Sequence, residues 1–131
     1  MLLVKTRIGP SRINGLGLFA AQFIPQGTHV WKMVRWFDLV LTKEQIDRLS
    51  NPAREQFIRC GHLDLYTGEY ILCADEARYL NHSENPNIRY NADSDQDIDV
   101  AVRDIQEGEE ITINYKEYDA NWPMKLSVSY P

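Results

Sequence analysis

The stretch ARYLNHSENPN, residues 77–87, decides how the rest of this sequence is interpreted. It places Asn81, His82 and Ser83 directly behind the apolar pair Tyr79-Leu80. The triplet matches a glycosylation acceptor, but that interpretation requires a secreted chain. Folding alone gives no evident reason for an Asn-His-Ser sequence at this point, so the stretch is a candidate functional segment.

Length and composition predict one globular domain over residues 1–131. The chain is 44% hydrophobic and 25% charged, enough to bury a core but not to divide into two. Its formal net charge is -5, from 19 acidic and 14 basic side chains, and no block of Lys or Arg stands out. Direct nucleic-acid binding is therefore not expected, whereas a basic protein or peptide is an acceptable partner.

The amino-terminal sequence and the cysteines indicate the compartment. The start, MLLVKTRIGPS, has only three consecutive apolar residues after Met1, too few for a signal peptide or a membrane span. Cys60 and Cys73 form no C-x-x-C motif and fit a reduced compartment, so no disulfide is assumed. We expect a soluble intracellular protein, cytoplasmic or acting in a nucleus or host nucleus, without membrane contact.

Periodicity predicts a mostly β domain with one helical insertion at about residues 42–60. The insertion has a capping box, Thr42 with Gln45, and a second helix that Gly61 closes. The sequence IQEGEE, residues 105–110, predicts a hairpin between the last two strands. The following segments are expected to be strands, from their β-branched and aromatic content or alternation: 2–7, 13–21, 28–34, 70–73, 88–91, 98–104 and 110–115.

Three other kinds of site fit the sequence poorly. Gly15-x-Gly17-x-x-Ala20 matches the dinucleotide fingerprint on paper, but no apolar strand precedes it and Pro25 and Gly27 cut off a following helix. The glycines then mark either a bend between strands or a close approach to a ligand. Ser83 beside His82 lacks the glycines of a nucleophile elbow. The spacing of the Cys and His residues at 60, 62, 73 and 82 matches no familiar zinc pattern, so no metal is expected.

The aromatic residues allow two interpretations. Tyr115 and Tyr118 stand close together with Trp122 behind them, among seven tyrosines in the chain. Each alone is ordinary core or surface material. Together they are also able to line an aromatic slot for an amine or alkylammonium.

Three motifs, NGLGLFA, ARYLNHSENPN and GEEITINY, occur in this order between Asn14 and Tyr115. The order resembles the SET domain of protein lysine methyltransferases, over about residue 5 to Tyr118. The resemblance implies a fold of several small sheets around a knot-like crossing, and binding of S-adenosylmethionine. The implied cofactor-binding residues are Gly15, Leu16, Gly17, Arg78, Tyr79, Asn81, His82 and Trp122.

The resemblance also implies the chemistry. Tyr115 matches the motif tyrosine and is the expected catalytic residue, orienting a substrate lysine amine beside the transferring methyl group. Tyr66, Ile113 and Tyr118 are expected to line the substrate channel. No cysteine follows Tyr115, so the C-terminal zinc segment of larger family members is absent. The segment at about residues 116–131 is then expected to form the lid, with Trp122 and its neighbours closing the channel.

Several functions remain open at this point. The first is a methyltransferase that acts on lysine in a protein, histones being one possible target. The second is a SET-like module that binds a peptide or S-adenosylmethionine without turnover, and the third is a scaffold that binds neither. Because a second subunit is able to complete a channel that lacks a lid, a homodimer is also an expectation.

Overall fold

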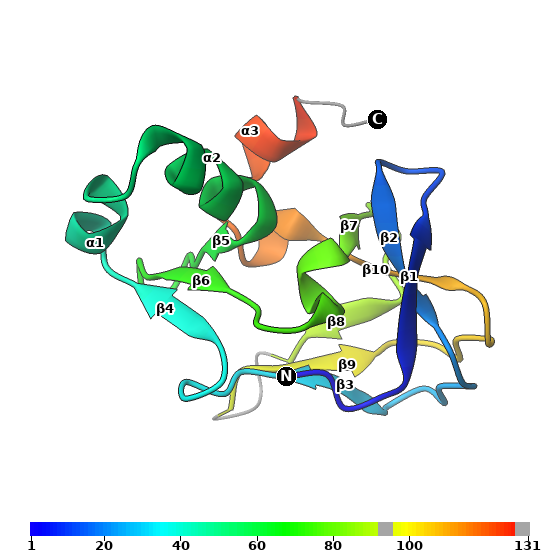
Figure 1. Cartoon of the computed structure of the whole chain (residues 1–131). Coiled ribbons are helices and arrows are strands. Elements are labelled where there is room, and N and C mark those ends of the chain that lie inside the picture. The colour runs from blue at the N-terminus through cyan, green and yellow to red at the C-terminus, as the bar shows by residue number, and fades with distance from the viewer. Residues whose placement is uncertain (92–95, 128–131) are drawn as a thin grey trace.

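The computed structural model describes residues 1–91 and 96–127. Within them, short strands form small sheets, and the α-helices lie along one side of the molecule (Figure 1). The predicted mostly β architecture is confirmed.

The first sheet carries the glycine motif. Its strands, in spatial order, are β1 (Thr6–Pro10), β2 (Leu16–Ala20), β10 (Glu110–Ile113) and β7 (Asn81–His82). β1 and β2 form an antiparallel hairpin closed by Gly15, whose φ of 49° lies in the left-handed region that glycine favours. β1 begins four residues later than predicted from residue 2 and includes Pro10. Proline is tolerated there because β1 is an edge strand.

The second sheet corrects one prediction. It consists of β3 (His29–Lys32), β9 (Ile98–Ala101) and β8 (Ile88–Tyr90), in that order. The hairpin predicted between the last two strands is wrong, because β9 pairs with β3 and β8 whereas β10 pairs with β2 and β7. Between them Ile105, fully buried, bridges to Ile24, which takes the chain out of the β9 sheet before β10 begins.

The third sheet and the helical insertion lie across the candidate active site, described below, from the first sheet. β4 (Leu39–Leu41), β6 (Tyr70–Leu72) and β5 (His62–Leu63) pair in that order. α1 (Lys43–Asp47) and α2 (Asn51–Cys60) fall inside the predicted insertion. The capping box is confirmed, since both of its hydrogen bonds between Thr42 and Gln45 are present. Gly61 ends α2 in an extended rather than left-handed conformation, and a Cβ there would collide with the carbonyls of Ile71 and Phe57.

Three short helical segments complete the fold. η1 (Glu76–Tyr79) overlaps the start of the Asn-His-Ser motif, whereas η2 (Tyr115–Glu117) and α3 (Trp122–Leu126) come at and after the end of the last motif. α3 was not predicted, because five residues give too little periodicity to detect. The described part of the expected lid segment forms η2 and α3, and residues 128–131 of that segment lie outside the described residues.

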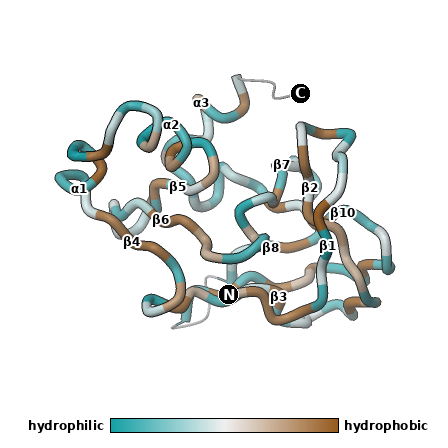
Figure 2. The backbone as a smooth tube through the Cα atoms, viewed as in Figure 1, coloured by the Kyte–Doolittle hydropathy of each residue, from teal (hydrophilic) through white to brown (hydrophobic). Residues whose placement is uncertain are grey.

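The central core joins the first two sheets. Hydrophobic segments of the chain coincide with their strands (Figure 2). The buried members of the core are Leu18, Ala20, Ile24, Val30, Ile88, Ala101, Ile105, Ile111 and Ile113. No helix in the described part of the chain is long and apolar enough to cross a membrane.

Candidate active site

The three motifs meet in one sheet. β10 lies between β2 and β7, antiparallel to the first and parallel to the second. Ile111 is opposite Leu18, and Ile113 is opposite His82. Segments separated by up to about a hundred residues in the chain therefore lie side by side (Figure 1).

A polar cluster holds these strands together. The Asn81 side-chain amide donates to the carbonyls of Asn14 and Leu16, at 3.2 and 3.0 Å, and to Glu110 Oε1 at 2.8 Å. Ser11 Oγ donates to the same carboxylate, at 2.8 and 2.9 Å. The Asn81 side chain therefore satisfies polar groups of the glycine motif and of β10.

The structure gives a reason for glycine at position 17 that the sequence alone did not reveal. A Cβ on Gly17 would overlap the Glu110 carboxylate. The missing side chain therefore makes room for the polar cluster rather than for a ligand alone, and Gly17 does not line the neighbouring cavity.

Asn87 fixes the other side of β10. Its side chain, 1% exposed, donates to the carbonyl of Glu110 at 2.8 Å and accepts from the N–H of Thr112 at 2.8 Å. Both backbone groups would otherwise be buried without partners, which costs about 1–3 kcal/mol each. The Asn-Pro-Asn end of the motif thus holds β10, the strand that leads to Tyr115, in place.

Tyr115 follows β10 directly and is held at both ends. Its N–H donates to His82 Nδ1 at 3.2 Å, and its hydroxyl donates to the carbonyl of Leu80 at 2.5 Å. Burial raises the pKa of the Tyr115 phenol, and the charges of Asp119 and Glu110 add to this. The phenol therefore stays protonated and neutral, with its oxygen lone pairs still able to accept a hydrogen bond.

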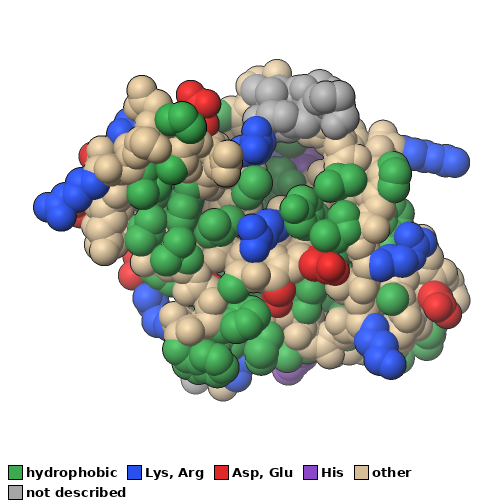
Figure 3. Space-filling view, viewed as in Figure 1, with side chains coloured by type: hydrophobic (Ala, Val, Ile, Leu, Met, Phe, Trp, Pro, Cys, Tyr) green, Lys and Arg blue, Asp and Glu red, His purple; other side chains and the backbone are tan. Residues whose placement is uncertain are grey.

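A cavity adjoins Tyr115 on the side of the glycine motif. We call it the glycine-side cavity, and its space of about 1090 Å³ is partly open to solvent. Of the expected cofactor residues it includes Gly15, Leu16, Arg78, Tyr79 and Asn81 in its lining. Gly17, His82 and Trp122 are not brought to it. Figure 3 shows this face of the molecule hollowed, with hydrophobic and Lys or Arg side chains at the rim.

A second cavity, which we call the passage, continues from Tyr115 into the molecule. Its walls include Trp31, Tyr66, Tyr90, Ile113, Tyr115 and Tyr118. All three residues expected to line a substrate channel, Tyr66, Ile113 and Tyr118, lie on it. The passage shares Tyr115, Arg78 and Leu80 with the glycine-side cavity.

An outer groove adjoins the passage on the side away from the glycine motif. The groove is lined by Met33, Arg35, Tyr66, Glu69, Tyr90 and Asp97. It shares Tyr66, Tyr90 and Asp97 with the passage, and the rings of the two tyrosines stack 5.7 Å apart at the junction. Glycine-side cavity, passage and outer groove are therefore neighbours that share walls, with Tyr115 between the first two.

Aromatic contacts make the passage apolar in the middle. Tyr118 lies edge-on to His62, with ring centroids 4.9 Å apart, and edge-on to Tyr115 at 6.2 Å. Burial lowers the pKa of His62 to about 4, helped by the charge of Lys125, so this imidazole is neutral near pH 7. Burial raises the pKa of the Tyr118 phenol well above its ordinary value.

Lys125 of α3 closes one side of the passage. Its Nζ lies 2.6 Å from Asp119 Oδ2 and 5.1 Å from the centroid of the Tyr115 ring, and it donates to the carbonyl of Gly61. Lys125 lines both the passage and the glycine-side cavity. The side chain on this wall is therefore that of Lys125, on the same helix as Trp122. The Trp122 ring itself faces the Lys116 ammonium at 5.2 Å.

The Cys and His residues weighed as zinc ligands do not come together. Among residues 1–91 and 96–127 no group of three or more His, Cys, Asp or Glu side chains is placed to hold a metal ion. Cys60 and Cys73 are both free thiols. Burial raises the pKa of the Cys73 thiol, which makes it a poor nucleophile.

A cavity on each side of one tyrosine, joined through it by an aromatic passage, is an arrangement suited to a transfer between two ligands that approach from opposite sides. The model of the SET domain family matches residues 15–116. This match covers most of the chain, including all three motifs, and the chain belongs to the SET domain family.

The relatives are histone-modifying enzymes. Human histone-lysine N-methyltransferase 2D is 30% identical over 115 residues, and the mouse protein of the same name matches equally. The match covers 81% of this chain but 2% of the relative, so the chain spans only a small part of these proteins.

Solved structures of the Polycomb Repressive Complex 2 from Chaetomium thermophilum share the fold. A humanized mutant with a bound inhibitor is 25% identical with a TM-score of 0.67, covering 92% of this chain and 16% of that chain. The complex in an autoinhibited conformation with S-adenosylmethionine is 24% identical with a TM-score of 0.65, covering 95% and 16% respectively. The predicted resemblance is confirmed at the level of family and fold.

Proposed function

We propose that this chain is an S-adenosylmethionine-dependent protein lysine N-methyltransferase, with Tyr115 as its catalytic residue. The observation that supports this best is the passage, which shares walls with the glycine-side cavity at Tyr115 and with the outer groove at Tyr66 and Tyr90. A cofactor and a protein substrate are thereby able to approach the same hydroxyl from opposite sides.

The glycine-side cavity fits the cofactor. Its space of about 1090 Å³, which is partly open to solvent, leaves room for a ligand of nucleoside size. The backbone at Gly15 and Leu16 and the side chains of Tyr79 and Asn81 would hold the nucleoside and methionine parts, and Arg78 supplies a cation for the carboxylate. When bound, S-adenosylmethionine provides an electrophilic methyl group on a sulfonium. Relatives include one structure with this molecule bound.

The passage fits a lysine side chain. A free lysine has a pKa of about 10.4, and its ammonium form has no lone pair for attack. At the Tyr115 end of the passage, burial beside Ile113 and Tyr118 and the positive charge of the sulfonium would disfavour the charged form, so the neutral amine becomes accessible near pH 7. Aligning the amine with the methyl group contributes roughly 7–11 kcal/mol in favourable cases.

Tyr115 orients the reacting groups without acting as a base. Its proton is directed to the Leu80 carbonyl, and burial raises the phenol pKa. The hydroxyl oxygen is left to accept a hydrogen bond from the amine or to polarise the methyl group. His82 holds the Tyr115 backbone in place.

The substrate would be a basic protein, since the chain carries a formal net charge of -5. Histones are one class to test, as the relatives named above are histone-lysine methyltransferases. A homodimer and the absence of direct nucleic-acid binding remain proposals from the sequence, which sedimentation and a gel-shift assay test. A module that binds without turnover is the alternative function.

Incubation with labelled S-adenosylmethionine and a panel of basic proteins, histones included, separates the two functions. An enzyme transfers label to at least one protein, and Tyr115→Phe reduces this about 100-fold or more while the cofactor affinity measured by calorimetry stays nearly the same. Cofactor binding without transfer to any protein supports the alternative. Turnover at the wild-type rate by Tyr115→Phe removes the role given to its hydroxyl.

A further inference from the structure

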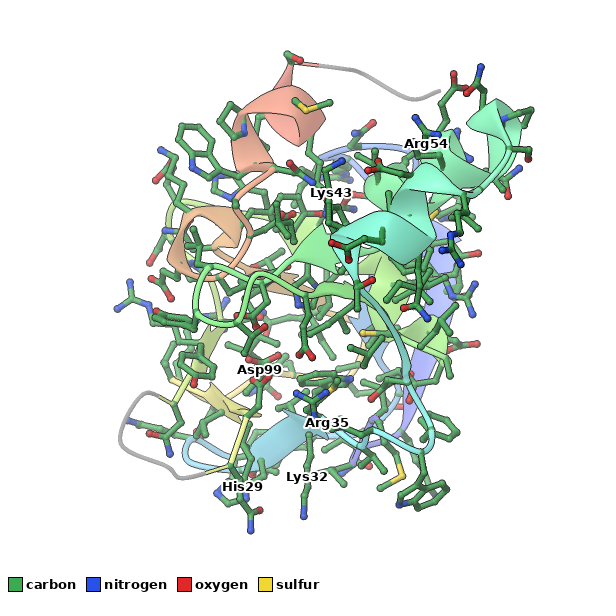
Figure 4. All side chains as sticks on the ribbon, turned by 90° about the vertical axis from the view of Figure 1, so that its left-hand side faces the viewer. His29, Lys32, Arg35, Lys43, Arg54 and Asp99 are labelled. Carbon is green, nitrogen blue, oxygen red and sulfur yellow. The ribbon has the colours of Figure 1, made fainter. Side chains whose placement is uncertain are left out.

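One carboxylate in the passage differs from the other buried acids. Asp99 lies in β9, opposite Trp31 and Tyr90 in the neighbouring strands, and is 7% exposed. It lines the passage together with Tyr118 and Asp97. Figure 4 shows Asp99 extending from β9 into the interior, whereas His29 and Lys32 point away from it.

The other buried carboxylates have structural partners. Asp38 and Asp64 each accept from two backbone N–H groups, at 2.7–3.1 Å. Asp119 accepts from two more and pairs with Lys125. For Asp99, by contrast, no hydrogen-bond donor is assigned within residues 1–91 and 96–127. Folding alone therefore gives no reason for a carboxylate here, since a buried charge without a partner is destabilising.

The surroundings of Asp99 are negatively charged. Asp97 lies on the same wall and lines both the passage and the outer groove. Its pKa is raised, first by burial and then by the charge of Asp64. Of the cations on this side, Arg35 is bound through two nitrogens to Glu69, at 3.2 and 2.8 Å, the amino terminus pairs with Asp38, and Lys32 lines the outer groove. Lys125, at the other end of the passage, is held by Asp119.

We propose that Asp99, assisted by Asp97, is a cation-binding subsite in the passage that receives the primary ammonium of a lysine side chain arriving from the outer groove. This rests on the proposed function and adds to it the residues that first hold the substrate cation. The stacked rings of Tyr66 and Tyr90 form the adjoining wall, where the aliphatic part of such a side chain packs. The ammonium would provide the missing donors to Asp99 through charge-assisted hydrogen bonds.

The subsite is tested with n-butylammonium chloride, a probe that has the lysine side chain's ammonium and aliphatic part. Amide NMR spectra of the protein are recorded during titration near pH 8, with neutral 1-butanol as the uncharged counterpart. The proposal requires shifts at residues lining the passage with n-butylammonium, and much weaker ones with 1-butanol. Because neither cofactor nor acceptor protein is present, this result does not depend on methyl transfer.

Asp99→Asn removes the charge and preserves the shape. It should weaken n-butylammonium binding about tenfold or more, as expected for a lost hydrogen bond to a charged group. Asp97→Asn should weaken it less. Asp47→Asn, an exposed carboxylate paired with Lys43 in α1, is the matched control and should bind as the wild type does. Absence of passage shifts in the wild type, or equal affinity in Asp99→Asn, would overturn the proposal.

Discussion

Asp99→Asn should also change how stability depends on pH. Burial, followed by the charge of Asp97, raises the pKa of Asp99 from 3.8 to about 7, with Glu117 adding to the shift and the amino terminus opposing it. Below about pH 4 the carboxyl is protonated in both the folded and the unfolded chain. Between about pH 4 and pH 7 only the unfolded chain ionises, so stability falls, and above pH 7 the loss is constant. A shift of about 3 units at about 1.36 kcal/mol each gives a loss of about 4 kcal/mol.

Urea denaturation of the wild type and of Asp99→Asn at about pH 4.5 and pH 8 measures this difference. The asparagine has no charge to bury, so the variant's unfolding free energy should rise relative to the wild type's by about 3 kcal/mol between the two conditions, because about 1 kcal/mol of the loss is already present at pH 4.5, where most unfolded chains carry the carboxylate. Asp47→Asn reports what removal of an exposed carboxylate does. A gap between wild type and Asp99→Asn that fails to grow with pH, or a variant less stable than the wild type at pH 8, would refute the reasoning.

Two further substitutions test the motif strands. Gly17→Val should both weaken cofactor binding and lower the melting temperature, because its side chain would displace the Glu110 carboxylate. Calorimetry that finds either of the two unchanged contradicts this. Ile113 is 2% exposed and lies on the passage wall. If this apolar side chain leaves room for further methyl groups, the wild type should reach di- or trimethyl-lysine. Ile113→Tyr should then shift the product towards monomethyl-lysine in mass spectra. Ile113→Phe crowds the wall without a hydroxyl and serves as the control, and strict monomethylation by the wild type would show this idea to be wrong.

The fold was predictable where the sequence carried a local signal. The capping box of Thr42 and Gln45 appears in full, and the strands around Leu18, Ile71 and Ile111 lie where alternation or β-branched residues indicated. The prediction that failed was the pairing of β9 with β10. Alternation in two strands that follow one another in the chain does not show which sheet each one joins. A short Gly-containing connection suggested a hairpin, and only the burial of Ile105 against Ile24 explains why none forms.

The passage was only partly predictable for a related reason. Ile113 and Tyr115 were found through their spacing within a motif, whereas Asp99 and Lys125 reach the passage from elements that no motif marks. For Asp99 a signal was present, an acidic residue between Ile98 and Val100 in a strand. Whether this carboxylate is buried depends on both faces of β9 being covered, which cannot be read from the sequence.

The residues that hold the fold together differ from those on which activity would depend, although all of them belong to the region that the family model matches. Asn81, Asn87, Gly17 and Glu110 interlock the three motif segments through hydrogen bonds and close packing. A chain that binds without turnover would need them just as an enzyme does, since they hold β2, β7 and β10 together. Under the proposed function, activity would depend instead on the hydroxyl of Tyr115 and on the binding of a substrate cation in the passage. Evidence that separates an enzyme from a binding module must therefore come from Tyr115 and Asp99, because substitutions in the interlocking residues disable both.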